Sequence, residues 1–120
     1  MPASSESLSQ RLAHLNEIKI TVTGRSSGRA ITIPVWFVAE ENTLFLLPLK
    51  GSDTQWYKNV LKNPSLRIEA GSTKIELRVE PMTNSAQVSS LVEKFRNKYG
   101  AGEVKKYYSK FDAALVGRAA

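Results

Sequence analysis

The sequence predicts an α+β domain: a small antiparallel barrel or split barrel whose open ends are capped by helices. Five or six segments have the alternating or β-branched patterns of strands. Strands that are neighbours in the chain have short connections, and short connections favour antiparallel pairing. Antiparallel strands with apolar faces commonly close into small barrels. The length of 120 residues favours a single domain over residues 1–120.

The first third of the chain predicts a helix followed by two strands. Leucines at helical spacing predict a short amphipathic helix over residues 5–14, and residues 17–23 alternate as a half-buried strand does. Residues 30–39 are apolar on both parities, which predicts a strand covered on both faces. Pro34 cannot donate a ladder hydrogen bond, so it marks an edge, a bulge or a functional opening of that strand.

A turn at residues 40–42 and a third strand over residues 43–49 come next. A loop then leads into a helix that Ser52 or Asp53 caps and that Asn63-Pro64 ends. The apolar face of this helix consists of Trp56, Tyr57, Val60 and Leu61.

The remaining elements follow from clean periodicity. Residues 66–70 and 74–80 alternate and are joined by Gly-Ser-Thr, which predicts a hairpin. Apolar residues on one face predict a longer helix over residues 84–99, and a short helix is expected at residues 103–110. Residues 112–117 are expected to close the sheet as a last strand.

Composition narrows the possible partners and the compartment. The net charge of +6 favours acidic partners, whether nucleic acid, anionic lipid or a phosphorylated small molecule. The chain has no cysteine, which excludes disulfides and thiolate chemistry and suits a cytosolic protein. No apolar run approaches the roughly 20 residues of a membrane span, and the N-terminus lacks the pattern of a secretory signal. We therefore expect a cytoplasmic protein.

Side chains able to perform acid–base or metal chemistry are few. The single histidine, His14, has no evident partner, and no triad, metal site or carboxylate pair can be assembled. If the chain is an enzyme, a cofactor is expected to carry the reaction.

Three clusters remain as candidate binding sites. Residues 24–29 hold two glycines that free the backbone and two arginines that could grip phosphate, but the same residues suit a plain hairpin turn. Residues 50–59 run from a Lys-Gly-Ser loop into a helix N-terminus, a natural anion site, although Trp56 could equally pack into the core. Basic and aromatic residues interleave over residues 94–110, as they do on nucleic-acid surfaces, but intervening acids favour a solvated face.

The first two clusters, with the strand between them, resemble the deazaflavin-dependent nitroreductase family. The segments are TGRSSGRAITIPVWFV and LFLLPLKGSDTQWYKNVLKNP, and the resemblance extends from Thr21 to about Ile68. Members are split β-barrels related to the pyridoxamine-phosphate-oxidase-like flavin-binding fold. The resemblance implies a homodimeric reductase that binds coenzyme F-420 and transfers hydride to a quinone, enone or nitro compound. The alternatives are an FMN-binding reductase of the same fold and a non-catalytic module that binds a cofactor or nucleic acid.

The resemblance also implies which residues form the site. The phosphate-side loop would be Arg25, Ser26, Ser27, Gly28 and Arg29, and the ring system would lie along Ile33, Pro34 and Val35. Lys50, Gly51 and Ser52 would approach the side chain of the cofactor, with Trp56, Tyr57 and Asn59 on the helix beside it. No catalytic residue is assigned. Tyr57, Tyr99 and Tyr107 are candidate proton donors by chemical type, as is Tyr108.

Overall fold

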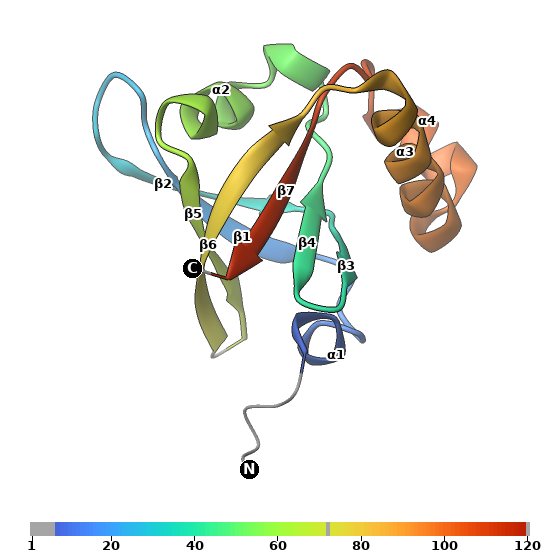
Figure 1. Ribbon diagram of the computed structural model, residues 1–120, viewed down its shortest axis with the longest axis horizontal. Coiled ribbons are helices and arrows are strands. Elements are labelled where there is room, and N and C mark those ends of the chain that lie inside the picture. The colour runs from blue at the N-terminus through green and yellow to red at the C-terminus, as the bar shows by residue number, and fades with distance from the viewer. Residues whose placement is uncertain (1–6, 72, 120) are drawn as a thin grey trace.

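A single seven-stranded antiparallel sheet forms the centre of the computed structural model, which describes residues 7–71 and 73–119 (Figure 1). The order across the sheet is β2-β1-β5-β6-β7-β4-β3. The strands are β1 Ile18–Thr23, β2 Ala30–Val35, β3 Val38–Glu40, β4 Thr43–Leu46, β5 Ser65–Ala70, β6 Thr73–Met82 and β7 Ala114–Ala119.

The connection between the two edge strands shows why this sheet curls. β2 and β3 lie at opposite edges, yet only Trp36 and Phe37 separate them in the chain. Seven strands laid flat would hold the edges about 29 Å apart, whereas three peptide steps reach only about 11 Å. The sheet must therefore bend until its edges approach one another, and the predicted split barrel is confirmed.

Four helices and one 3-10 turn surround the sheet. They are α1 Leu8–Arg11, η2 Gly51–Asp53, α2 Gln55–Lys62, α3 Ser85–Tyr99 and α4 Ala101–Tyr107. The main core lies inside the curled sheet, where α1 and α2 add to its apolar residues. A second apolar cluster joins α3 and α4, which lie side by side, to β3 and the start of β7 (Figure 1). Each helix in the described part of the chain is too short or too polar to cross a lipid bilayer.

The strand predicted over residues 30–39 differs from the structure in two ways. It is broken into β2 and β3 at Trp36, and β2 is not covered on both faces, because Ile31 is 38% exposed. β2 is an edge strand and therefore lacks a neighbour on one side. Pro34 lies in β2 opposite Lys19. Of the edge, bulge and functional opening considered for this proline, the structure shows the edge.

The N-terminal helix is shorter than predicted. Ser7 caps it through a reciprocal capping box with Gln10, and it ends at Arg11 rather than at residue 14. The predicted first residues, Ser5 and Glu6, lie outside the described residues.

Two predictions about α2 are wrong. Its N-cap is Thr54, because the side chains of Ser52 and Asp53 are bonded to a distant segment of the chain instead. Leu61 was predicted on the apolar face of this helix, but its side chain is 50% exposed. The polar residue Asn59 is buried instead.

The other elements agree with their predictions apart from their ends. β5 and β6 form the predicted hairpin, whose turn residue Ser72 lies outside the described residues. β4 ends at Leu46, before residue 49, and α4 covers Ala101–Tyr107 rather than residues 103–110. α3 starts at its Asn84 cap as predicted, and β7 closes the sheet.

Candidate functional site

An apolar cleft of about 560 Å³ opens beside the edge strand β2. Its walls come from β2, the link to β3, the segment after β4, the start of α2 and the end of α4. The lining residues are Glu17, Ile33, Pro34, Val35, Trp36, Leu47, Leu49, Thr54, Trp56, Tyr107 and Tyr108. Glu17 is the one charged side chain among them, so a ligand in the cleft meets mostly aliphatic and aromatic surface.

β2, which lines this cleft, is an edge strand of the sheet formed within residues 7–71 and 73–119. It pairs with β1 on one side and has no strand on the other. Half of the main-chain polar groups of an edge strand face away from the sheet. The segment Ile33–Val35 thus gives the cleft an apolar wall on the open edge of the sheet, where Pro34 has no N–H to donate.

Trp36 is held in place by two tyrosines. Its ring stacks on Tyr99 with centroids 4.2 Å apart and 6° between the planes, and Tyr107 meets it edge-on at 5.5 Å. Aromatic pairs in these geometries add stability beyond the area that they bury. Trp36 therefore presents a fixed surface to the cleft.

Tyr99 does not line the cleft, and its hydroxyl is engaged elsewhere. It donates toward the carbonyls of Asn16 at 2.7 Å and Phe37 at 3.1 Å, and it accepts from the Phe37 N–H. Burial raises the pKa of Tyr99, so the phenol stays protonated at neutral pH. Its contacts fix the strand link rather than face a ligand.

The other candidate proton donors differ in access. Tyr107 lines the cleft and is 51% exposed. Tyr57 is buried outside the cleft, where desolvation and the charge of Asp112 raise its pKa. Tyr108 lines the cleft but is buried, and desolvation raises its pKa far above the usual value. Among these tyrosines, Tyr107 alone has both a place in the cleft and contact with solvent.

Residues 24–29, interpreted from the sequence as a hairpin turn or a phosphate-binding loop, form a hairpin turn. The Gly24 N–H donates to the Arg29 carbonyl at 2.8 Å, and the Gly28 N–H donates to the Gly24 carbonyl at 2.9 Å. Gly28 has φ +71°, a conformation that favours glycine. The Ser27 hydroxyl accepts from the Arg29 N–H at 3.1 Å, and Ser26 is exposed. None of these residues lines the cleft.

Arg25 joins this turn to α2. One of its guanidinium nitrogens donates to Asn59 Oδ1 at 2.7 Å and the other to Gln55 Oε1 at 2.7 Å. The Arg25 main-chain N–H also donates to Asn59 Oδ1, at 3.1 Å. Two clusters that are 30 or more residues apart thus meet, although Arg25 and Asn59 contact each other rather than the cleft.

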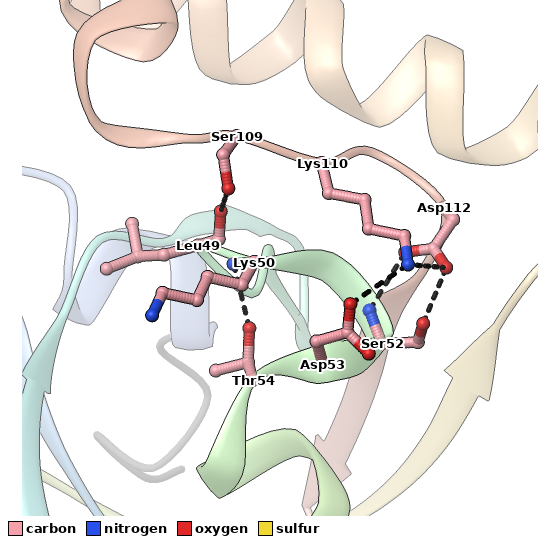
Figure 2. Close-up of polar contacts among 8 residues, drawn as sticks. All are labelled: Leu49, Lys50, Ser52, Asp53, Thr54, Ser109, Lys110 and Asp112. Atoms are coloured by element: carbon pink, nitrogen blue, oxygen red, sulfur yellow. Dashed lines mark hydrogen bonds and ion pairs between the residues drawn. The ribbon is translucent and has the colours of Figure 1, made fainter.

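The Lys50–Ser52 loop, predicted as an anion site, contacts a carboxylate of the chain itself. Ser52 donates to Asp112 through its N–H at 2.8 Å and its hydroxyl at 2.6 Å (Figure 2). Gly51 is buried with φ +54°, and a methyl group on it would collide with Asp112 Oδ1. The Lys50 side chain extends on the Leu49 side, away from Asp53 and Asp112.

Trp56 packs into the core, as one of its two interpretations has it, and it has a place in the cleft as well. It is 8% exposed within the main core, and it also lines the cleft.

The structure thus brings part of the predicted site together. Ile33, Pro34, Val35, Trp56, Tyr107 and Tyr108 share the cleft. The cleft residues that the sequence did not single out are Glu17, Trp36, Leu47, Leu49 and Thr54. Trp36 lies where the chain passes from β2 to β3, and no local pattern in the sequence marked that position. The described residues contain no cluster of three or more His, Asp or Glu placed to share a metal ion.

The basic C-terminal cluster is largely engaged within the chain. Lys94 pairs with Glu40 and Arg96 with Glu93. Lys98 donates to the Phe37 carbonyl at 2.8 Å. Three of the basic side chains in this cluster are therefore held by contacts within the chain.

Comparison with known proteins assigns the chain by sequence and by fold. The family model described as "Uncharacterized protein conserved in bacteria (DUF2255)" matches residues 9–115. No curated protein matches the sequence. An F-420-H2-dependent reductase, FDR-A, superposes with a TM-score of 0.68 and 18% identity, covering 87% of this chain and 95% of that one.

Two further solved structures share the fold. HutZ, a haem storage protein from Vibrio cholerae, has a TM-score of 0.69 and 11% identity over 90% of this chain and 84% of that one. A putative pyridoxamine 5'-phosphate oxidase from Listeria innocua has a TM-score of 0.62 and 12% identity over 89% and 84%. At these identities the likeness is one of architecture.

Proposed function

The chain belongs to the bacterial family DUF2255, and we propose that it is a reductase that binds coenzyme F-420 in the cleft beside β2. The observation that carries the proposal is the aromatic and apolar lining of this cleft around Pro34, Trp36 and Trp56. The volume of about 560 Å³ lies within the range usual for small-molecule sites. The F-420-H2-dependent reductase of the same fold supports the choice of cofactor.

The lining fits a planar ring system. One wall is the strand Ile33–Val35 with its outward main-chain groups, and Trp36 supplies a rigid aromatic surface at its end. Such groups can meet the polar edge of a heterocycle while the side chains cover its faces. Leu47 and Leu49 add apolar cover and exclude water from the ring.

Positive charge near the cleft fits the phosphate and acidic tail of such a cofactor. Among the residues that the structure describes, Arg25 is bonded to neutral groups only, so no carboxylate there compensates its charge. Within residues 7–71 and 73–119, the guanidinium group of Arg29 and the ammonium group of Lys50 have no ion-pair or hydrogen-bond partner. We propose that these three residues attract the anionic parts of the cofactor.

The protein's tasks in this reaction are to bind, orient and protonate. When bound, the cofactor would supply the hydride. Tyr107 lines the cleft and is half exposed, so its hydroxyl is our candidate for delivering a proton to the reduced acceptor, which would be a small quinone, enone or nitro compound.

The second candidate is an FMN-dependent reductase that uses the same cleft. The likeness to a putative pyridoxamine 5'-phosphate oxidase favours it, since an apolar cleft with nearby arginines suits either ring system.

We also propose that two copies pair through the exposed face of β2, because the partly exposed Ile31 side chain would be buried there.

Titration of the purified protein with F-420 and with FMN tests the proposal. We expect saturable F-420 binding, followed by the cofactor's fluorescence, and at least a tenfold loss of affinity in Trp36→Ala. Leu61→Ala is the matched control, because Leu61 is exposed on α2 outside the cleft. Tyr107→Phe should keep the affinity and lower turnover with a nitro or quinone acceptor.

Each possible outcome has a defined meaning. Absence of saturable F-420 binding would rule out the proposed cofactor, and tight FMN binding would transfer the protein to the second candidate. Equal loss of affinity in Trp36→Ala and Leu61→Ala would place the ligand outside this cleft.

A further inference from the structure

The segment between α4 and β7, residues 108–113, is bonded to the loop that follows β4. We call this segment the strap. Its Ser109 N–H donates to the Leu49 carbonyl at 2.8 Å, and the Lys110 ammonium donates to Asp53 at 3.1 Å. At its far end the Asp112 carboxylate accepts both hydrogen bonds from Ser52 (Figure 2).

The two segments joined in this way both contribute residues to the cleft wall. Leu49 and Thr54, on either side of η2, line it from one segment. Tyr107 and Tyr108, at the end of α4 and the start of the strap, line it from the other. The contacts between strap and loop therefore set the distance between these two parts of the wall.

The bonds of the strap differ in strength. The side chains of Lys110 and Asp53 are 46% and 65% exposed, and exposed ion pairs contribute little. Ser52 instead holds both oxygens of Asp112, whose side chain is 42% exposed, through two charge-assisted hydrogen bonds that are shorter than the Lys110–Asp53 contact. The backbone at Gly51 is shaped around the same carboxylate, because any side chain there would displace it. We call the Ser52–Asp112 contact the clasp.

We infer that Asp112 is a positioning residue of the cleft: the clasp holds the strap against the loop and so keeps Tyr107 and Tyr108 in the wall, and its opening admits and releases the ligand. The identity of the ligand rests on the proposed function, whereas the clasp itself does not. The Ser52 hydrogen bonds also keep the pKa of Asp112 below its usual value, so the clasp stays ionised throughout the neutral range.

The first test uses the free protein. The chain has two tryptophans, Trp36 and Trp56, and both line the cleft, so acrylamide quenching of their fluorescence reports directly on its opening. We expect Asp112→Ala to raise the quenching constant at least twofold and to speed amide exchange in residues 108–113 at least tenfold. Exchange in β5 and β6 should stay unchanged, which separates a local opening from loss of the fold.

The matched control is Lys110→Met, which removes the exposed ion pairs and leaves the clasp intact. It should change quenching and exchange less than twofold. Asp112→Asn keeps the shape of the side chain and one acceptor oxygen, so we expect an intermediate effect. Equal effects of Lys110→Met and Asp112→Ala, or no change in either variant, would overturn the inference.

The second test uses bound F-420 in stopped-flow displacement. Asp112→Ala should raise the dissociation rate about tenfold with a smaller change in the equilibrium constant, because a gate affects entry and exit together. An unchanged dissociation rate would overturn the gating role. If the wild type binds neither F-420 nor FMN, the proposed function fails, and quenching and exchange still decide whether the clasp opens the cleft.

Discussion

Gly51→Ala perturbs the clasp from its other side. Gly51 lies at φ +54°, and a methyl group on it would meet Asp112 Oδ1 and Lys110 Cγ. The substitution therefore has two costs: the left-handed backbone conformation of an alanine, and the displacement of the Asp112 carboxylate from Ser52. A second glycine in the chain allows these costs to be separated.

Gly71→Ala is that control. Gly71 has nearly the same φ, +62°, but nothing lies within 4 Å of the position that a methyl group would take. A left-handed alanine costs roughly 1–2 kcal/mol, so Gly71→Ala should lower the free energy of unfolding by about that much. Hydrogen bonds to charged groups contribute about 1.5–3 kcal/mol. Because the Asp112 side chain is 42% exposed, solvent recovers part of this, and we expect an excess of about 1 kcal/mol for Gly51→Ala.

Urea unfolding followed by tryptophan fluorescence measures both variants against the wild type. In an Asp112→Ala background the excess should vanish, because the carboxylate that the methyl group displaces is absent. Equal destabilisation by Gly51→Ala and Gly71→Ala in the otherwise native chain would show that Asp112 does not pack on Gly51. An excess that persists in the Asp112→Ala background would assign it to a contact other than Asp112, such as the one with Lys110 Cγ.

Two further predictions concern the link between β2 and β3. Tyr99→Phe removes the hydroxyl that serves Asn16 and Phe37, so the free energy of unfolding should fall by about 1–3 kcal/mol; a urea midpoint equal to that of the wild type would contradict this role. Lys98 lies with its ammonium 3.4 Å from the centre of the Phe37 ring, and burial of that group lowers its pKa to about 8. At pH 8 about half of Lys98 is therefore neutral, against about 0.4% of an ordinary lysine. Competitive acylation followed by mass spectrometry should label Lys98 well ahead of Lys105. Equal labelling of the two lysines would contradict the lowered pKa.

The elements that the sequence predicted well are those whose pattern is local. β5 and β6 alternate cleanly across a short turn, and α3 shows its apolar face and its Asn84 cap within one stretch of chain. The break between β2 and β3 has no such local signal, since residues 30–39 are apolar or aromatic throughout apart from Thr32. It arises because the curled sheet needs the chain to pass from one edge to the other at Trp36 and Phe37.

The Lys50–Ser52 loop shows how a pattern typical of an anion site can serve a group of the chain itself. The Gly-Ser pattern before a helix predicted an anion, and an anion is there, but it is the carboxylate of Asp112, 60 residues along the chain. A chain that binds no cofactor would need the same Gly51 and Ser52 to hold its strap. The loop therefore supports the fold more directly than it supports a function. Trp36 differs from Ser52 in this respect. Its ring stacks on Tyr99, which explains its place in the fold, but that contact does not explain why Trp36 also lines the cleft. For that reason substitutions at Trp36, rather than at Ser52, decide between a binding cleft and a merely apolar surface.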